Sequence, residues 1–219
     1  MPESASVPAT ADALARQVTR LATNSPADRS VLRHSLGKSP KEVALGVHRI
    51  VVPFVPDHAP ESAERAYYAV AALIASQPRD ARARTGDSRE DSAPPPRDAP
   101  DGQRPAAGQR RRNLGSSLAL AVDKGGNANS LENHLQLLAR QDLDGLHRHL
   151  PRLILQLRGD QVHIDWGVLI RDLTRWAHDP RQVAKEWAQD YYRTSERLTA
   201  KKRKNEHATA NHETEETPS

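Results

Sequence analysis

Two pairs of arginines lie four positions apart in the sequence, Arg148 with Arg152 and Arg171 with Arg175. If each pair belongs to a helix, its two guanidinium groups project from the same side, one turn apart. Arginine presents a planar fork of N–H donors to phosphate, whereas lysine presents a point charge. The first chemistry that these residues predict is therefore binding of a phosphate backbone.

Two histidine motifs could instead bind a metal ion. His147 and His149 are close in sequence but lack acidic partners at matched helical spacing. The pair His178-Asp179 resembles the core pair of HD-type phosphohydrolases, which requires further His and Asp ligands upstream and downstream. Here Asp179 precedes a proline, as the capping residue of a helix does. We expect no metal site and no cofactor.

Signals for catalysis are also missing. The chain contains no cysteine, which excludes disulfides and thiolate chemistry. It has no His-Glu-x-x-His motif, no glycine-rich phosphate loop and no Gly-x-Ser-x-Gly motif. We therefore expect no catalytic residues and no enzymatic activity.

The elements that must position these side chains are predicted to be helices. In Ser25-Pro26-Ala27-Asp28, the serine can cap a helix, the proline takes its first position and the aspartate its third. The same arrangement begins at Ser39 and at Asp179. Helices are expected around residues 14–21, from Ser25, from Ser39 to just before Pro53, and over 60–76, 117–122, 131–140, 144–157, 165–177 and 180–193. Strand signals do not recur, so the fold class is all-α.

The faces of these helices separate apolar from basic residues. Over 165–177, the apolar residues form one arc, and Arg171 and Arg175 lie opposite it. Arg148, Arg152 and Arg140 likewise point away from the apolar stripes of their helices. If these basic sides converge, they form a groove for a phosphate backbone. The alternative is a solvated face with ion pairs, but few acidic residues share these faces.

The three tryptophans, Trp166, Trp176 and Trp187, could stack on exposed bases. Their helical spacing instead places them where core residues should lie. We therefore expect them in the core.

Two stretches have too few apolar residues to join a core. Residues 78–112 contain six Pro, nine Arg and six acidic residues, with no Val, Ile, Leu or aromatic residue. Residues 194–219 contain a single Leu, and their basic run Lys201-Lys202-Arg203-Lys204 is followed by acidic residues. We expect a disordered insert and a disordered tail. The insert could be a basic arm that finds nucleic acid, but its composition favours an insert without such a role.

Net charge, hydropathy and the N-terminal residues indicate which cellular compartment to expect. The net charge of +4 is modest and alone does not indicate nucleic acid. No apolar run approaches the ~20 residues of a membrane helix, and the N-terminus lacks the features of a signal peptide. A soluble, cytoplasmic protein without a membrane partner is expected.

The C-terminal half resembles the CasB family, the small subunit of the type I-E CRISPR Cascade complex. The resemblance is carried by Leu114-Gly115-Ser116-Ser117-Leu118-Ala119-Leu120-Ala121, Leu137-Leu138-Ala139-Arg140, the block 146–157, Ile164-Asp165-Trp166, the block 169–176 and the block 181–192, which ends in Trp187-Ala188-Gln189-Asp190-Tyr191-Tyr192. A weaker match upstream includes Ala27-Asp28-Arg29, Leu32-Arg33 and Val52-Pro53-Phe54.

The resemblance implies two small helical bundles, which we place at 11–77 and 113–193. It does not cover the long disordered insert 78–112 that joins them or the disordered tail 194–219. It implies a non-catalytic subunit of an RNA-guided antiviral complex that stabilises the R-loop. Its partners would be the guide RNA (crRNA), the target and displaced DNA strands, the backbone and large Cascade subunits and a second copy of itself. The working residues carried over are Arg33, Lys124, Arg140, Arg148, Arg152, Arg181 and Lys185.

The sequence departs from the family at two points. Asn133-His134 stands where relatives often have an arginine pair. Pro151 lies inside the helix expected at 144–157, where relatives have a proline at the helix start, so a kink or a later start is expected.

Two other kinds of function stay open. A helix-turn-helix regulator would need a recognition helix, for which Arg181-Gln182 is the candidate. A purely architectural spacer would contact only protein.

Overall fold

The computed structural model describes residues 7–77, 111–159 and 161–215, with side chains for 10–77, 111–159 and 161–207. Every regular element in this part of the chain is helical. The elements are α1 (Val7–Asn24), α2 (Pro26–Arg33), the 3₁₀ turn η1 (Pro40–Glu42), α3 (Leu45–Val51), the 3₁₀ turn η2 (Val52–Phe54), α4 (Glu61–Ala75), α6 (Leu114–Asp123), α7 (Ala128–Ala139), α8 (Leu143–Gly159), α9 (Trp166–Trp176) and α10 (Pro180–Glu215). The all-α prediction is confirmed. The predicted insert lies outside the described residues except for Arg111 and Arg112.

The predicted helix starts are correct at Ser25 and wrong at Ser39. Ser25 caps α2, with its side chain accepting a hydrogen bond from the Asp28 amide. Ser39 forms a capping box with Glu42, but only the turn η1 follows. The backbone of Val43 and Ala44 is extended, so α3 begins at Leu45. The capping signal is local, and it does not determine how long the helix that follows will be.

In the second half, asparagine and aspartate caps begin the helices. Asn113, Asn127 and Asp165 each accept a hydrogen bond from the amide three residues later, at the start of α6, α7 and α9. The helix α8 begins at Leu143 and continues through Pro151, so of the two expected outcomes, a kink or a later start, the later start does not occur. The capping serines and asparagines are short polar side chains that satisfy free amides at a helix end.

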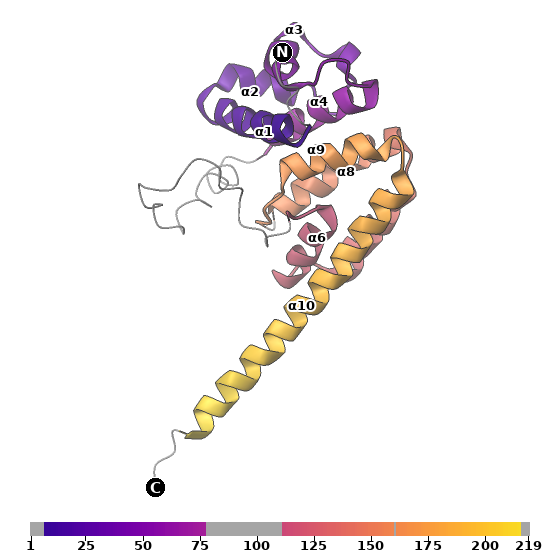
Figure 1. Cartoon of the computed structure of the whole chain (residues 1–219). Coiled ribbons are helices and arrows are strands. Elements are labelled where there is room, and N and C mark those ends of the chain that lie inside the picture. The colour runs from indigo at the N-terminus through magenta and orange to yellow at the C-terminus, as the bar shows by residue number, and fades with distance from the viewer. Residues whose placement is uncertain (1–6, 78–110, 160, 216–219) are drawn as a thin grey trace, which may run out of the picture.

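The C-terminal tail is the main correction. We predicted disorder over 194–219, but α10 continues to Glu215 and extends away from the body of the molecule (Figure 1). The reason is that Ala, Lys, Arg and Glu have high helix propensity even where no apolar face is buried. Lys202 also fastens this part of α10 to the end of α6, through an ion pair with Asp123 at 2.9 Å.

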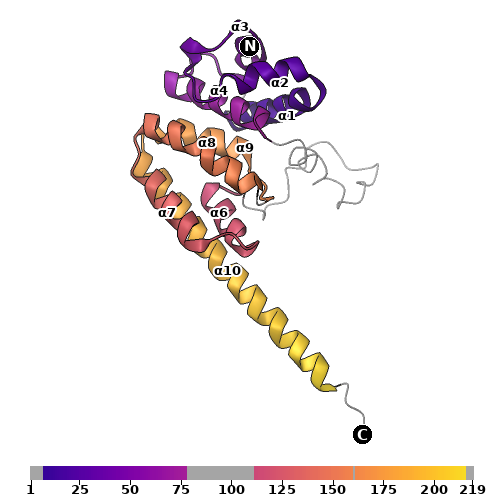
Figure 2. The same cartoon turned by 180° about the vertical axis from the view of Figure 1, so that it is seen from behind.

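The helices are arranged as stacked groups. In Figures 1 and 2, the α1–α4 group covers α8 and α9, and α6, α7 and α10 lie on the other side of that pair. The helix α9 is central, because it packs against α1 and α4 on one side and α10 on the other. One continuous core joins both halves of the chain. The division into two domains stays a prediction.

The core contains the tryptophans, as predicted. Trp176 and Trp187 are 1% and 0% exposed, and their rings lie 5.1 Å apart. Trp166 is 6% exposed. None of these rings is available for stacking on a base. In the described helices, no stretch is long and apolar enough to cross a membrane.

Helices α6 and α10 pack closely at Gly115. A Cβ atom built on Gly115 would overlap the backbone carbonyl of Trp187. Only glycine allows the two helices to lie this close.

Substituting Gly115→Ala should force α6 and α10 apart and destabilise the fold by roughly 2–3 kcal/mol. Gly159→Ala is the matched control, because a Cβ there meets nothing within 4 Å. Urea unfolding followed by circular dichroism would measure both. Equal stability of the two variants would contradict the packing described.

Candidate nucleic-acid interface

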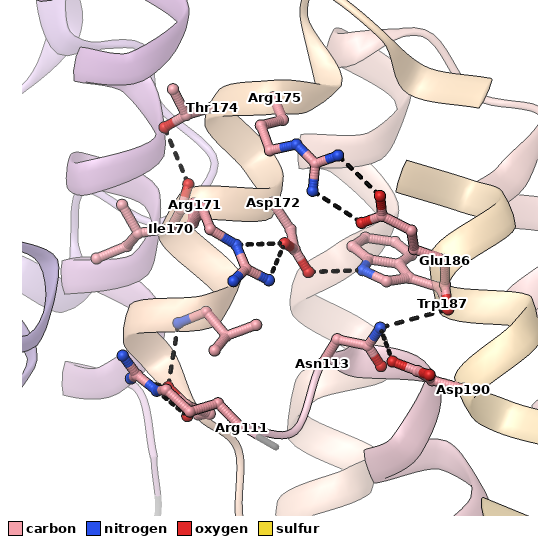
Figure 3. A network of polar contacts seen from close by, with 12 residues as sticks. Arg111, Asn113, Ile170, Arg171, Asp172, Thr174, Arg175, Glu186, Trp187 and Asp190 are labelled. Carbon is pink, nitrogen blue, oxygen red and sulfur yellow. Dashed lines mark hydrogen bonds and ion pairs between the residues drawn. The ribbon is translucent and has the colours of Figure 1, made fainter. Parts of the chain in front are cut away.

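Asp172 lies at the centre of a buried polar network (Figure 3). Its side chain comes from α9 and the residue is 1% exposed. Trp187 Nε1 on α10 donates to Oδ2 at 2.8 Å, and Arg171 Nε and Nη2 donate to Oδ1 at 3.1 and 2.9 Å. Burial raises the pKa of the Asp172 carboxyl, while the bonds from Trp187 and Arg171 act in the opposite direction. The carboxylate therefore joins α9 to α10 and uses Arg171 as its counter-ion.

An ion pair between Arg175 and Glu186 also joins α9 to α10. Arg175 binds Glu186 through two hydrogen bonds of 2.8 Å, and the Gln182 side chain donates to the same carboxylate at 2.9 Å. The bonds from Arg175 are the main reason that the pKa of Glu186 is lowered to about 2. The Arg175 fork is therefore occupied within the chain.

Phosphate binding by Arg171 and Arg175 stays a prediction, and these two contacts weigh against it. Both lie on the face opposite the apolar arc, as expected, but carboxylates hold them there. Glu186 belongs to the next helix, so a single-helix pattern could not reveal it. Asp172 is adjacent to Arg171, and a long arginine side chain can fold back to reach it.

Most of the other predicted cations are free of ion pairs within the described residues. These exposed residues are Arg33, Arg140, Arg148, Arg152, Arg181 and Lys185. Lys124 is also exposed, but its Nζ donates to the Gln161 carbonyl at 2.6 Å. The free guanidinium and ammonium groups are available for an anionic ligand.

The end of α2 lies beside the middle of α8. Residues 36–38, after α2, line one small cavity together with His147, Leu150 and Pro151 of α8. The exposed Lys38 lines this cavity, Arg33 ends α2 just before it, and Arg148 and Arg152 are the exposed residues of α8 that follow His147 and Pro151. We call these four cations the α8 surface. Sequence reasoning missed Lys38. It follows Gly37, whose φ is +79°, in the turn after α2.

The remaining cations lie toward the two ends of α8. Trp176 Nε1 donates to the Gln141 carbonyl at 3.3 Å, so the α7–α8 and α9–α10 connections are neighbours. Arg140 belongs to the first of these connections, and Arg181 lies in the first turn of α10, just after the second. Lys124 contacts Gln161, beyond the far end of α8, which is about 25 Å long. Lys124 is therefore not part of the same local cluster.

Neither histidine motif forms a metal site within the described residues, where no group of three metal-binding side chains occurs. His147 is buried and His149 is exposed, so they do not face a common ligand. Burial, with a smaller effect of Arg65, lowers the pKa of His147 to about 4. Asp179 caps α10 by accepting from the Gln182 amide at 3.0 Å, as predicted.

Arg111 makes an ion-pair contact that the sequence analysis did not predict. We assigned it to the disordered insert, but its guanidinium binds both Asp12 in α1 and Asp165 at the start of α9. The hydrogen bonds from Asp165 and Asp12 raise its pKa. No local signal could have found this contact, because Asp12 lies 99 positions away in sequence.

Comparison with known proteins identifies relatives of this chain. The family described as CRISPR-associated protein Cse2 matches residues 28–192. A chain of a solved CRISPR RNA-guided surveillance complex is 51% identical, with 90% of this chain and 99% of that chain covered and a TM-score of 0.74. A chain of a pre-nicking surveillance complex is 50% identical, with the same coverage and a TM-score of 0.75.

A more distant structure, CasB from M. ruber, is 22% identical, with 89% of this chain and 97% of that chain covered and a TM-score of 0.63. At this identity the likeness shows a shared fold. A search of curated proteins found no match.

The Arg175–Glu186 pair should make stability depend on pH. The folded state holds the pKa of Glu186 near 2, below its ordinary value of 4.5. The carboxylate therefore stabilises the fold above about pH 4.5, and this contribution is lost as the pH falls toward 2. The stability difference between wild type and Glu186→Gln should shrink over this range, as measured by urea unfolding. The exposed control Glu206→Gln should show no such change, and a pH-independent difference for Glu186→Gln would contradict the assignment.

Proposed function

Because the chain belongs to the CRISPR-associated Cse2 protein family, we propose that it is a non-catalytic subunit of an RNA-guided DNA-surveillance complex. It binds the phosphate backbones of the guide RNA and target strand and steadies the displaced strand of the R-loop. Its partners are these nucleic acids, the backbone and large subunits and a second copy of the chain. The half-identical relatives, which belong to surveillance complexes, support this assignment.

The observation that carries the proposal is the α8 surface. Arg33, Lys38, Arg148 and Arg152 are exposed and have no ion pair within the described residues. Elsewhere the same chain pairs its arginines with carboxylates, as at Arg171, Arg175 and Arg111. Unpaired cations at neighbouring positions repel one another, and a phosphate backbone relieves that repulsion.

Such contacts would act on a nearly balanced equilibrium. Exchanging a DNA duplex for an RNA–DNA duplex changes the free energy little, so small added contacts decide how long the R-loop persists. Contacts to phosphate carry no sequence information. The subunit would therefore prolong the opened state without changing which target is chosen.

The helix-turn-helix alternative has weaker support. Gln182 is the candidate recognition residue of this alternative. Its side-chain amide donates a hydrogen bond to the Glu186 carboxylate, which Arg175 also binds. The Gln182 amide group is therefore not free to read a base.

The double substitution Arg148→Glu and Arg152→Glu, in the assembled complex, should shorten the R-loop lifetime roughly tenfold because two attractive contacts become repulsive. Target preference should be unchanged. The lifetime is measured from dissociation of fluorescent target DNA.

The matched control is Arg16→Glu with Arg20→Glu, which reverses two exposed arginines one turn apart on α1. It should leave the lifetime near that of wild type. An unchanged lifetime for the α8 double variant, with normal assembly, would refute the phosphate role and favour a spacer that contacts only protein.

A further inference from the structure

An open groove lies between the start of α6 and the middle of α10. Its volume is about 700 Å³. Its lining residues are Arg111, Arg112, Ser116, Leu120, Asp190, Arg193, Thr194, Glu196, Arg197, Leu198 and Lys201. We call it the α6–α10 groove. Its lining from Thr194 to Lys201 belongs to the part of α10 that the sequence analysis had assigned to a disordered tail.

Positive charge in this groove exceeds negative charge. Arg111 is already neutralised by Asp12 and Asp165. Four cations remain against the two carboxylates of the lining, Asp190 and Glu196. The four are Arg112, Arg193, Arg197 and Lys201.

These four cations have weak acidic partners, or none, within the described residues. Arg112 and Lys201 are exposed and have no ion pair there. Arg193 lies 3.8 Å from Asp190, whose other oxygen accepts from Asn113 Nδ2 at 2.8 Å. Arg197 donates to two neutral acceptors, the Arg193 carbonyl and the Thr194 hydroxyl, each at 3.1 Å. The groove therefore has spare positive charge for an anion.

The spacing of the cations matches a chain of phosphates. Arg193, Arg197 and Lys201 follow one another at intervals of four residues, so they form a row along α10 with a step of about 6 Å. This step is close to the distance between consecutive phosphates in an extended single strand. Arg112 lies on the α6 side of the groove, and a backbone lying between would meet cations on both walls.

The floor of the groove adds neutral donors. Ser116 and Thr194 are nearly buried, and their hydroxyl oxygens lie 3.5 Å apart. Hydroxyls bind phosphate or sugar oxygens without reading bases. The described lining has no aromatic side chain on which a base could stack.

We propose that the α6–α10 groove binds the sugar–phosphate backbone of a single-stranded polynucleotide, independently of base sequence. This site lies apart from the α8 surface and deepens the proposed function, on which it rests for the class of ligand. The row of three cations tracks the strand, and Arg112 closes the opposite side.

The test measures binding of a fluorescent oligothymidylate to the purified full chain as salt is varied. Arg193→Gln with Arg197→Gln should weaken binding roughly tenfold and make the log–log salt slope less negative by about 1.4, since each lost phosphate contact contributes about 0.7. The control Arg203→Gln with Lys204→Gln removes the same charge from exposed positions of α10 that do not line the groove. Its affinity and salt slope should remain close to those of wild type.

Three outcomes would overturn the groove assignment. The first is equal loss in the groove and control variants, which would show only an effect of net charge. The second is binding of a DNA duplex as tightly as the single strand. The third is displacement of the oligonucleotide by poly-glutamate at equal charge concentration, which would indicate an acidic protein partner.

Failure of the groove is distinguishable from failure of the proposed function. Arg148→Glu with Arg152→Glu is measured in the same assay. If this variant loses affinity and the groove variant does not, the groove assignment is wrong and the proposed function stands. If the groove variant alone loses affinity, the groove is supported and the α8 surface is not.

Discussion

The hydrogen bond between Asp172 and Trp187 is the interaction on which the rest of the arrangement depends. A carboxylate that is 1% exposed must be fully bonded, because an unpaired buried charge is strongly destabilising. Trp187 and Arg171 supply those bonds, and the bond from Trp187 fixes α10 against the central helix α9. Gly115 then allows α6 to approach the Trp187 backbone. The position of the α6–α10 groove follows from this close packing.

The arginines of this chain fall into two physical groups. Arg111 and Arg175 hold helices together through carboxylates from other helices, and Arg171 is the counter-ion of the buried Asp172 within α9. Arg148, Arg152, Arg193 and Arg197 keep their charge at the surface with weak or no acidic partners. The second group is free to release counterions on meeting a phosphate backbone, which is the source of affinity in such binding. A fold held rigid by the first group can present the second group without rearranging.

Local patterns in the sequence predicted the helices well and the charges only in part. Caps such as Ser25 and Asp179 and apolar spacings such as that of Trp166 and Trp176 depend on neighbours within one or two turns, so they can be read directly. The pairing of Arg175 with Glu186 and of Arg111 with Asp12 depends on packing between helices. The prediction for the tail was wrong for a different reason. The scarcity of apolar residues was taken as a sign of disorder, although the helix propensity of these residues is high.

The central claim is that paired arginines build the fold while unpaired ones bind phosphate. Arginine-selective modification with phenylglyoxal, read by mass spectrometry on the assembled complex with and without its R-loop, tests this residue by residue. We expect Arg33, Arg148 and Arg152 to react in the complex without its R-loop and to be protected in the complex that holds it, while Arg171 and Arg175 react slowly in both. Unchanged reactivity of Arg148 and Arg152 when the R-loop forms would contradict the account.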